Sequence, residues 1–272
     1  MTAETDAPDP TSSLLAFFGS ELKRIRQGAG VSQDEAATRS HTTQSMISKV
    51  EAAKRVPSEE LACDLDMAFG TGGHFARLYP LVITYAYPSW FLPFVELERE
   101  ATAMRVFESQ IVPGLLQTEE YARAMLYAVR PENLDGLIAA RMTRQEVFER
   151  ESSPRTWFVM DENVLLRPIG GAAVMRHQLT RLLEQGRNPR CVIQVVPRTV
   201  PAHAGLAGPF TVLSFEEGAD VLYVDGFSQG RTALDTHEIA TATYSFDLLR
   251  AVALSPDESA CLISAHLEGL DR

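Results

Sequence analysis

Apolar residues recur every three or four positions through the first third of the chain, which is the spacing of amphipathic helices. The first series predicts a helix over residues 14–27, and its members are Leu15, Phe18, Leu22 and Ile25. Gly28 and Gly30 follow it and favour an end to the helix there. The preceding residues are polar and include two prolines, so we expect a disordered tail over residues 1–13.

Residues 31–55 have the pattern of two short helices joined by a tight turn. Ser32 and Glu35 have capping-box spacing for the first helix, and Thr42 or Thr43 can cap the second. In the second helix the apolar positions are Ile47 and Val50, whereas the opposite face consists of Gln44, Ser45, Ser48 and Lys49. Short amide and hydroxyl groups suit base edges in a major groove. The pattern alone leaves two interpretations open: a helix pair that reads DNA, or an amphipathic pair with a solvated face.

A further helix is predicted from Ser58 to the glycines that begin at Gly70. Residues 78–95 then contain no charge over 18 positions, the length at which a membrane helix has to be considered. Because prolines interrupt any helix in this stretch, we expect no membrane span and interpret residues 75–95 as an apolar linker helix or dimer seam, with a fifth helix of the N-terminal domain as an option at residues 74–87. These prolines are Pro80, Pro88 and Pro93.

The second half of the chain mixes helical and strand patterns. Strands are predicted at residues 156–160, 191–196, 210–215 and 221–224, the last two as a hairpin. Helices are predicted at 96–104, after Thr118, and at 131–151, 173–185, 235–253 and after Ser255. The expected fold class is an all-α domain of four to five helices at residues 14–74, followed by an α+β domain at residues 96–272 with a small, mostly antiparallel sheet.

The charge distribution is compatible with DNA binding by one part of the chain. The net charge of −11 is unusual for a DNA-binding protein, but residues 20–57 hold seven basic and four acidic side chains, a local charge of +3. Phosphate binding by so small a basic island would be modest and salt-sensitive, so we expect two copies to act together as a homodimer. The acidic remainder would repel DNA and orient the protein on it.

Cysteine usage and the start of the chain favour the cytoplasm. Cys63, Cys191 and Cys261 lie far apart, without the spacing of a disulfide framework or a zinc site. No basic stretch precedes the short apolar run at residues 14–18, so we expect no secretory signal. The expected location is cytoplasmic, in association with the nucleoid.

Two motifs in residues 31–55 resemble the repressor-type helix-turn-helix family, the phage-repressor or xenobiotic-response-element group. They are Ser32-Gln33-Asp34-Glu35-Ala36-Ala37 and Ile47-Ser48-Lys49-Val50-Glu51, followed by the basic pair Lys54-Arg55. The family usually has glycine two residues after that glutamate, whereas this chain has Ala53. We therefore expect the turn that ends the recognition helix to be shaped differently from the turn in the family.

Residues 92–265 resemble a C-terminal domain of unknown function that occurs in many actinobacterial helix-turn-helix regulators. The resemblance rests on the motifs IVPGLLQTEEYARA, DENVLLRPIGG, MRHQL and IQVVP…HAGLAGPF, and on the pair Arg144-Gln145. That family is described as antitoxin-like and is often encoded beside a small protein. The resemblance implies a regulator whose C-terminal domain dimerises and receives a signal from a small protein or a small-molecule effector, and it carries no catalytic residues.

Three further features of the sequence could take part in catalysis, metal binding or anion binding. Residues 226–230 match the G-x-S-x-G nucleophile elbow around Ser228, with His237 and His266 downstream, but the helix and parallel strands that the elbow needs are not predicted, so a turn is favoured. The six histidines show no metal-ligand spacing, and we expect no metal and no cofactor. Arg141, Arg144 and Gln145 share one predicted helix face, which either binds an anionic partner group or is simply solvated.

The sequence as a whole predicts a homodimeric DNA-binding transcriptional repressor, with an inverted-repeat operator in double-stranded DNA. The expected base contacts are Thr43, Gln44, Ser45 and Lys49, and the expected phosphate contacts are Gln33, Ser48, Lys54 and Arg55. The first alternative is an antitoxin that masks a small toxin-like protein and represses its own operon. The second is an enzyme that uses Ser228.

Overall fold

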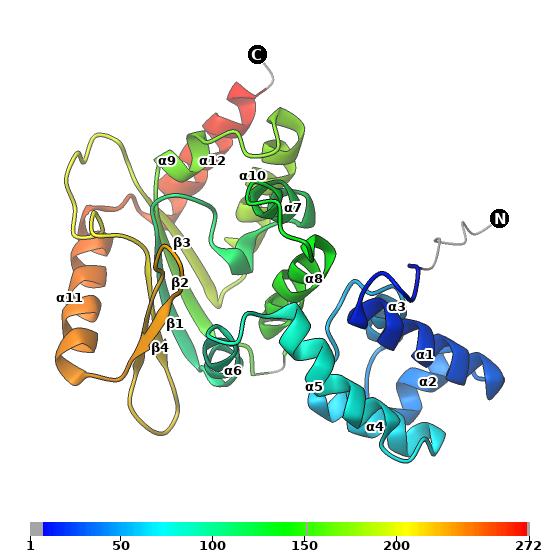
Figure 1. Cartoon of the computed structure of the whole chain (residues 1–272). Coiled ribbons are helices and arrows are strands. Elements are labelled where there is room, and N and C mark those ends of the chain that lie inside the picture. The colour runs from blue at the N-terminus through cyan, green and yellow to red at the C-terminus, as the bar shows by residue number, and fades with distance from the viewer. Residues whose placement is uncertain (1–7, 151, 271–272) are drawn as a thin grey trace. The chain divides into compact units, whose positions relative to one another are not determined.

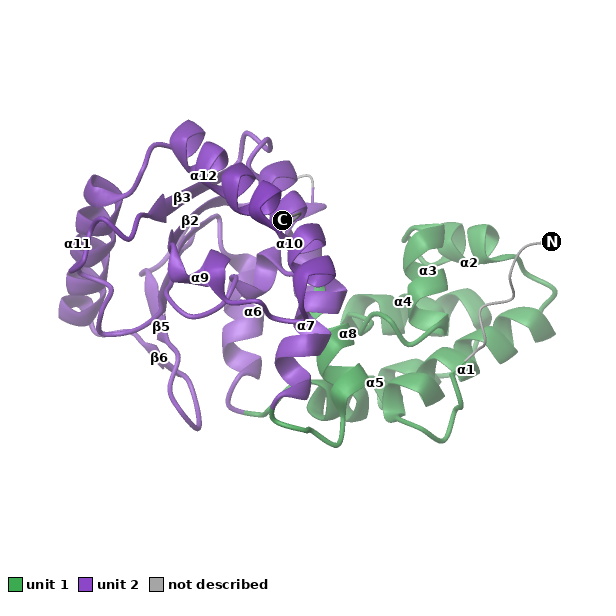
Figure 2. Cartoon of the chain, turned by 90° about the horizontal axis from the view of Figure 1, so that it is seen from above, with its two compact units in different colours: residues 1–89, 129–143 green, residues 90–128, 144–272 purple. Residues whose placement is uncertain are grey.

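The computed structural model describes residues 8–150 and 152–270 of the chain. The chain forms two compact units, which Figure 2 shows in different colours. The first unit contains residues 1–89 and 129–143, and the second contains residues 90–128 and 144–272. Residues 1–7 of the predicted tail lie outside the described residues.

The first unit consists of helices throughout its regular structure, in agreement with the helical N-terminal domain predicted from the sequence. Its helices are α1 (Leu14–Gly28), α2 (Gln33–Arg39), α3 (Gln44–Glu51), α4 (Glu59–Phe69), α5 (His74–Ala86) and most of α8 (Leu134–Arg144). Each of α1 to α4 begins at a hydroxyl side chain that accepts a hydrogen bond from a backbone N–H three residues later, and these caps are Ser13, Ser32, Thr43 and Ser58.

Helix α5 continues through Pro80, although the sequence predicted that this proline would interrupt any helix. A proline inside a helix costs about 3 kcal/mol. Burial of Phe75 and Val82 favours the helix, and the Asp66 carboxylate accepts the backbone N–H groups of Phe75 and Ala76 at 3.0 and 2.8 Å. Tertiary packing and this cap together outweigh the local preference of the proline.

Helix α8 reaches the first unit from a later part of the chain, an arrangement that the sequence did not predict. The Tyr87 hydroxyl donates to the backbone carbonyl of Ala140 at 2.9 Å, and the Val56 N–H donates to the Thr143 hydroxyl at 2.8 Å. The first unit is therefore closed by a helix that follows it by more than forty residues in the sequence.

The second unit is built on a six-stranded mixed sheet with the order β3-β2-β1-β4-β5-β6 (Figure 1). The strands are β1 (Ala103–Glu108), β2 (Arg155–Asp161), β3 (Cys191–Val196), β4 (Phe210–Ser214), β5 (Val221–Val224) and β6 (Arg231–Ala233). Strands β1, β2 and β3 are parallel, whereas β4, β5 and β6 are antiparallel.

The predicted small, mostly antiparallel sheet is therefore wrong. Helix α6 (Leu92–Glu100) ends four residues earlier than predicted, and the residues after it form β1 in the middle of the sheet. Long helical connections lead from β1 to β2 and from β2 to β3, and connections of that kind join parallel strands. The predicted hairpin of β4 and β5 is confirmed.

Helices cover both faces of the sheet. The larger core lies between one face and α6, η1 (Gly114–Leu116), α7 (Glu119–Tyr127), α9 (Asn163–Leu166), α10 (Ala172–Gln185) and α12 (Pro256–Gly269), and η2 (Gln145–Phe148) also contributes to it. On the opposite face, α11 (Thr236–Val252) packs Ile239, Phe246 and Leu249 against the strands. Helix α11 thus lies over this face of the sheet, as Figure 1 shows on its left-hand side.

The G-x-S-x-G motif lies in the loop between the antiparallel strands β5 and β6, where Val224 pairs with Arg231. A nucleophile elbow requires a helix directly after the serine, and here a strand follows instead. Within residues 8–150 and 152–270, no helix is long and apolar enough to span a bilayer. The same residues contain no group of three side chains arranged to hold a metal ion.

Candidate DNA-binding surface

Helices α2 and α3 of the first unit are joined by a tight turn whose backbone is fixed by hydrogen bonds. The Ser40 hydroxyl is buried and donates to the Ala36 carbonyl at 2.7 Å, and the Thr42 N–H donates to the Ala37 carbonyl at 2.9 Å. Between them His41 adopts a left-handed φ of 50°. Thr43 then caps α3 by accepting the Met46 N–H at 3.2 Å. The helix pair predicted from residues 31–55 is confirmed.

Helix α3 turns its apolar residues inward and its polar residues outward. Ile47 and Val50 are fully buried, whereas Gln44 and Ser45 are exposed. Helix α1 crosses α3 closely at Gly19, since a Cβ atom there would lie 2.4 Å from the Val50 carbonyl oxygen. Only glycine permits this approach, so Gly19 sets the short distance between α1 and α3.

A buried chain of polar side chains runs from α1 to the exposed start of α3. Two guanidinium nitrogens of Arg26 donate to the two Glu51 oxygens at 2.5 and 2.9 Å. The Gln33 amide nitrogen donates to Glu51 at 2.9 Å, and the Gln33 amide oxygen accepts from the Gln44 amide nitrogen at 2.8 Å. The hydrogen bond that Arg26 donates to Glu51 raises the pKa of Arg26 above its ordinary value. Three helices thus fix the orientation of one exposed amide.

The pairing of Arg26 with Glu51 was not predicted, although the sequence indicates that Arg26 is buried and needs an acidic partner. Arg26 follows Leu22 at i+4 spacing and therefore lies on the apolar face of α1. An arginine in that position is seldom buried without an acidic partner. The partner Glu51 is 25 residues away, beyond the reach of helical periodicity.

Most of the arginines in the basic island are already paired within the first unit. Arg24, Arg26 and Arg39 form ion pairs with Glu21, Glu51 and Glu35. Lys49 and Lys54, in contrast, have no ion-pair partner among the residues that the structure describes, and Lys54 is exposed. Arg55 is half-buried and donates to the Lys54 carbonyl at 2.8 Å. Lys49 and Lys54 thus provide ammonium groups available to an outside anion.

The turn after α3 keeps a left-handed backbone without glycine. Ala53 has a φ of 54°, and the Lys54 N–H donates to the Lys49 carbonyl at 2.8 Å across it. This is the hydrogen-bond pattern of a Schellman motif, in which glycine usually occupies the left-handed position. The expectation that alanine would change the shape of this turn is therefore wrong, because Ala53 itself adopts the strained conformation.

Ala53→Gly should stabilise the first unit by about 1 kcal/mol, since glycine adopts a left-handed φ without a Cβ clash. The matched control is Ala52→Gly, at a φ of −87°, which should destabilise by about 0.5–1 kcal/mol. Hydrogen exchange of the α1 and α3 amides measures both changes. A loss of protection in Ala53→Gly would contradict the strain assigned to this turn.

Two of the three candidate partner residues outside the helix-turn-helix, Arg144 and Gln145, already have contacts within the second unit. The Arg144 side chain is 9% exposed and pairs with both oxygens of Glu98 at 2.7 Å, with its guanidinium 4.9 Å from the ring centre of Phe91. Gln145 donates to the Gln117 carbonyl at 2.7 Å and accepts from Arg181 at 3.0 Å. Arg141 is half-buried on α8. Binding of an anionic partner there stays a prediction.

Two known families match the chain, over successive parts of the sequence. A helix-turn-helix domain matches residues 18–78, and a domain of unknown function, DUF5753, matches residues 91–265. No curated protein and no solved structure matches the chain. The helix-turn-helix match supports a DNA-binding regulator, and the surface formed by α2, α3 and the following turn is its candidate DNA-binding surface.

Proposed function

The chain belongs to the family defined by the domain of unknown function DUF5753, and from its helix-turn-helix domain we propose that it is a homodimeric transcriptional repressor that binds an inverted-repeat operator. The observation that carries the proposal is the exposed Gln44 amide, which Gln33 and Glu51 hold at the start of α3. A side chain pre-oriented in this way loses little rotamer freedom on binding.

Helix α3 would enter the major groove with its first turn toward the bases. Gln44 uses one amide hydrogen on Gln33, which leaves its second amide hydrogen and its carbonyl oxygen. These two groups match the N7 acceptor and the N6 donor of adenine, so Gln44 would read an adenine in each half-site. Thr43, Ser45 and Lys49 are the other proposed base contacts.

Phosphate contacts would come from the rim of the same surface. Lys54 is exposed beyond the end of α3 and is the strongest candidate, with Arg55 next to it in the sequence and Ser48 within α3. Gln33 already donates to Glu51, but one hydrogen of its amide nitrogen remains for a phosphate oxygen. These contacts would set the register on the duplex without reading its sequence.

The second copy would pair through α11. Its outward face carries Tyr244, Leu248 and Val252 at four-residue spacing, with exposed fractions of 65, 43 and 40%. Tyr244 lies at the middle of the helix, so antiparallel pairing about a two-fold axis would place it against its own copy. In the stretch predicted as a seam, by contrast, Val82, Tyr87 and Phe94 are buried within their own units.

Leu248→Glu should therefore convert the dimer into a monomer and weaken operator binding at least tenfold, because a glutamate in an apolar interface would be buried without a counter-charge. Light scattering after gel filtration gives the mass directly. The comparison variant is Leu81→Glu, which places the same charge on an exposed position of α5. If Leu81→Glu dissociates the dimer and Leu248→Glu does not, the seam predicted from the sequence is the interface and α11 is not.

The function itself is tested by selecting bound sequences from random double-stranded DNA with the full chain. We expect enrichment of an inverted repeat with half-site centres about one helical turn apart. Placed over a promoter, the selected site should lower transcription of a reporter when the protein is present. Failure to enrich any sequence, or enrichment of single half-sites alone, would overturn the proposal of a dimeric repressor.

A further inference from the structure

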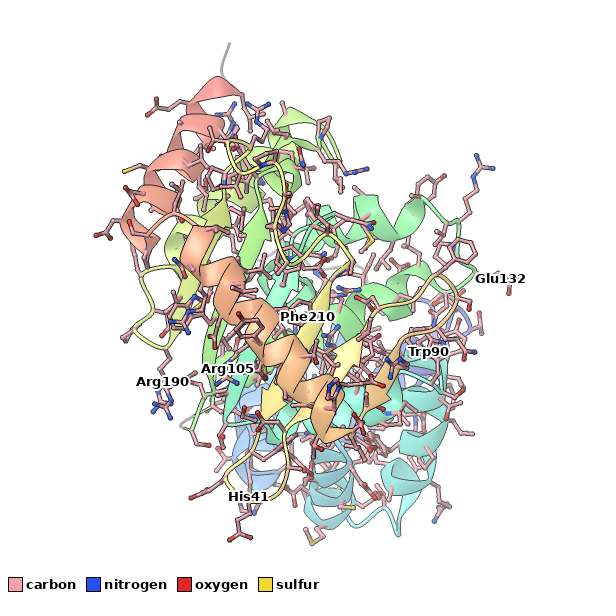
Figure 3. The ribbon with its side chains drawn as sticks, turned by 90° about the vertical axis from the view of Figure 1, so that its left-hand side faces the viewer. His41, Trp90, Arg105, Glu132, Arg190 and Phe210 are labelled. Atoms are coloured by element: carbon pink, nitrogen blue, oxygen red, sulfur yellow. The ribbon has the colours of Figure 1, made fainter. Side chains whose placement is uncertain are left out.

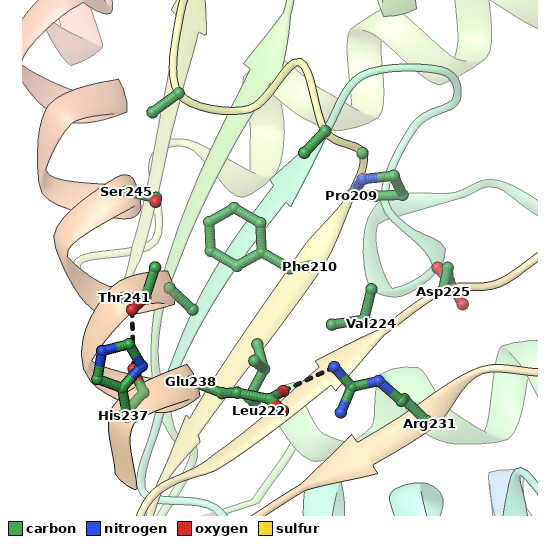
Figure 4. A pocket seen from close by; sticks show the side chains of 14 residues that line it. Pro209, Phe210, Leu222, Val224, Asp225, Arg231, His237, Glu238, Thr241 and Ser245 are labelled. Carbon is green, nitrogen blue, oxygen red and sulfur yellow. Dashed lines mark hydrogen bonds and ion pairs between the residues drawn. The ribbon is translucent and has the colours of Figure 1, made fainter. Parts of the chain in front are cut away.

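A pocket of about 450 Å³ lies in the second unit between α11, the adjoining ends of β4, β5 and β6, and the loop over residues 204–209. Its floor is apolar and is formed by Phe210, Leu222 and Val224 (Figure 4). Phe210 and Arg105 both lie on the sheet face that α11 covers, as Figure 3 shows. The volume falls within the range of pockets that bind small organic molecules.

The pocket exists because one helix covers a broad sheet and turns small residues toward it. A helix is about 10 Å wide, or roughly two strand spacings, so α11 leaves part of the floor uncovered. The α11 residues that line the pocket include Thr241, Ala242 and Ser245, and the loop contributes Ala204, Ala207 and Gly208. Small side chains on two walls keep the volume open above large ones on the floor.

The loop that forms one wall is anchored at its base. The Gly205 N–H donates to Nδ1 of His203 at 3.2 Å, so Nε2 carries the proton and donates to Asp161 at 3.0 Å. Gly205 also lies against the Phe107 ring, where a Cβ atom would be 2.1 Å from a ring carbon. Both anchors belong to the folded chain itself, so the wall is formed before any ligand arrives.

The position in the sheet is one at which ligands bind in other α/β folds. Phe210, the first residue of β4, pairs with Phe107 near the carboxyl end of β1. The pocket therefore lies at the carboxyl ends of the parallel strands, beside the β1–β4 boundary where the sheet changes from parallel to antiparallel. Open sheets with parallel strands bind ligands at such ends, next to a switch in topology.

The rim carries more negative than positive charge. Arg231 pairs with Glu238 at 2.6 Å, so the arginine among the lining residues already has a counter-charge. The Asp225 carboxylate and the Ser245 hydroxyl have no hydrogen-bond partner within the part of the chain that the structure describes. We propose that this pocket binds a hydrophobic organic cation, with its flat apolar body over Phe210 and its ammonium group toward Asp225 and Glu238.

The proposal does not depend on DNA binding and is tested on the full chain with three naphthalene probes of equal size. The probes are 2-naphthylmethylammonium, 2-naphthylmethanol and 2-naphthoate. Isothermal titration should show saturable binding of the ammonium probe, weaker binding of the alcohol and the weakest binding of the carboxylate. Absence of saturable binding by the ammonium probe, or tightest binding by naphthoate, would overturn the proposal.

Two variants locate the site. Ala242→Trp should fill the pocket and weaken binding of the ammonium probe at least tenfold, whereas the control Ala173→Trp, at an exposed alanine on α10, should leave it unchanged. Asp225→Asn changes an exposed rim residue and leaves the fold intact, so it gives a reading even if Ala242→Trp misfolds. It should weaken the ammonium probe about two- to fivefold and leave the alcohol unchanged. Unchanged ammonium binding in Asp225→Asn would refute the charge assignment.

Discussion

Replacing Glu51 with alanine should lower the free energy of unfolding of the first unit by about 3–5 kcal/mol, the largest effect on stability that we expect from a single substitution. Glu51 accepts two hydrogen bonds from Arg26 and one from Gln33, and the side chains of the Arg26–Glu51 pair are only 10 and 4% exposed. Removal of the carboxylate leaves a buried guanidinium without its counter-charge, and that desolvation penalty dominates the cost.

The measurement has to report on the first unit alone, because both tryptophans, Trp90 and Trp157, belong to the second. Hydrogen exchange read peptide by peptide gives this resolution, with the sheet of the second unit as internal reference. Protection of α1 and α3 should fall by roughly two to four orders of magnitude, since about 1.4 kcal/mol corresponds to a factor of ten. The control Glu35→Ala removes an ion pair whose side chains are 44 and 51% exposed, and should cost at most about 1 kcal/mol. A Glu51→Ala loss below about 1 kcal/mol would show that the pair is not desolvated.

Local signals account for what the sequence predicted well. Helix starts at Ser32 and Ser58, and at Thr42 or Thr43, were predicted because a hydroxyl and the N–H that it accepts are three residues apart; the structure has the cap at Thr43. The inward direction of Ile47 and Val50, and with it the outward face of α3, follows from helical periodicity alone. The exposed face of α3 could therefore be predicted before the fold was known.

What the sequence did not predict depends on residues far apart along the chain. Strand β1 forms a parallel pair with β2, whose residues follow it by about fifty positions, and nothing local in residues 103–108 indicates that pairing. The return of α8 to the first unit and the assembly of the pocket are non-local in the same way. Pro80 shows the opposite case, in which a strong local signal is overridden by packing.

The separation of residues along the chain also explains why the candidate DNA-binding surface was predicted only in part. Gln33 and Gln44 were assigned separately, one to phosphate and one to a base, and the structure joins them at 2.8 Å. Glu51 accepts a hydrogen bond from Gln33 and so supports the Gln33–Gln44 pair from the buried side. The orientation of Gln44 is thus a property of the folded unit and is tied to the same buried pair that stabilises it.

Gln44→Ala should remove discrimination at one base pair of each half-site, by about 1–3 kcal/mol, while binding to non-specific DNA stays unchanged. The reason is that Gln44 offers one amide hydrogen and one carbonyl oxygen for an adenine edge but carries no charge for phosphate. Competition between the selected operator and versions with the adenine replaced, at fixed salt, measures the loss directly.

Two comparison variants separate base reading from positioning and from charge. Gln33→Ala leaves Gln44 in place but frees its amide, so discrimination should fall less than in Gln44→Ala. Lys54→Ala should weaken all sequences to a similar degree and reduce the salt dependence by about one phosphate contact per subunit. If Gln44→Ala retains full discrimination while Lys54→Ala behaves as expected, the protein binds DNA through this surface but reads it with other residues, and the role assigned to the Gln33–Gln44 pair is wrong.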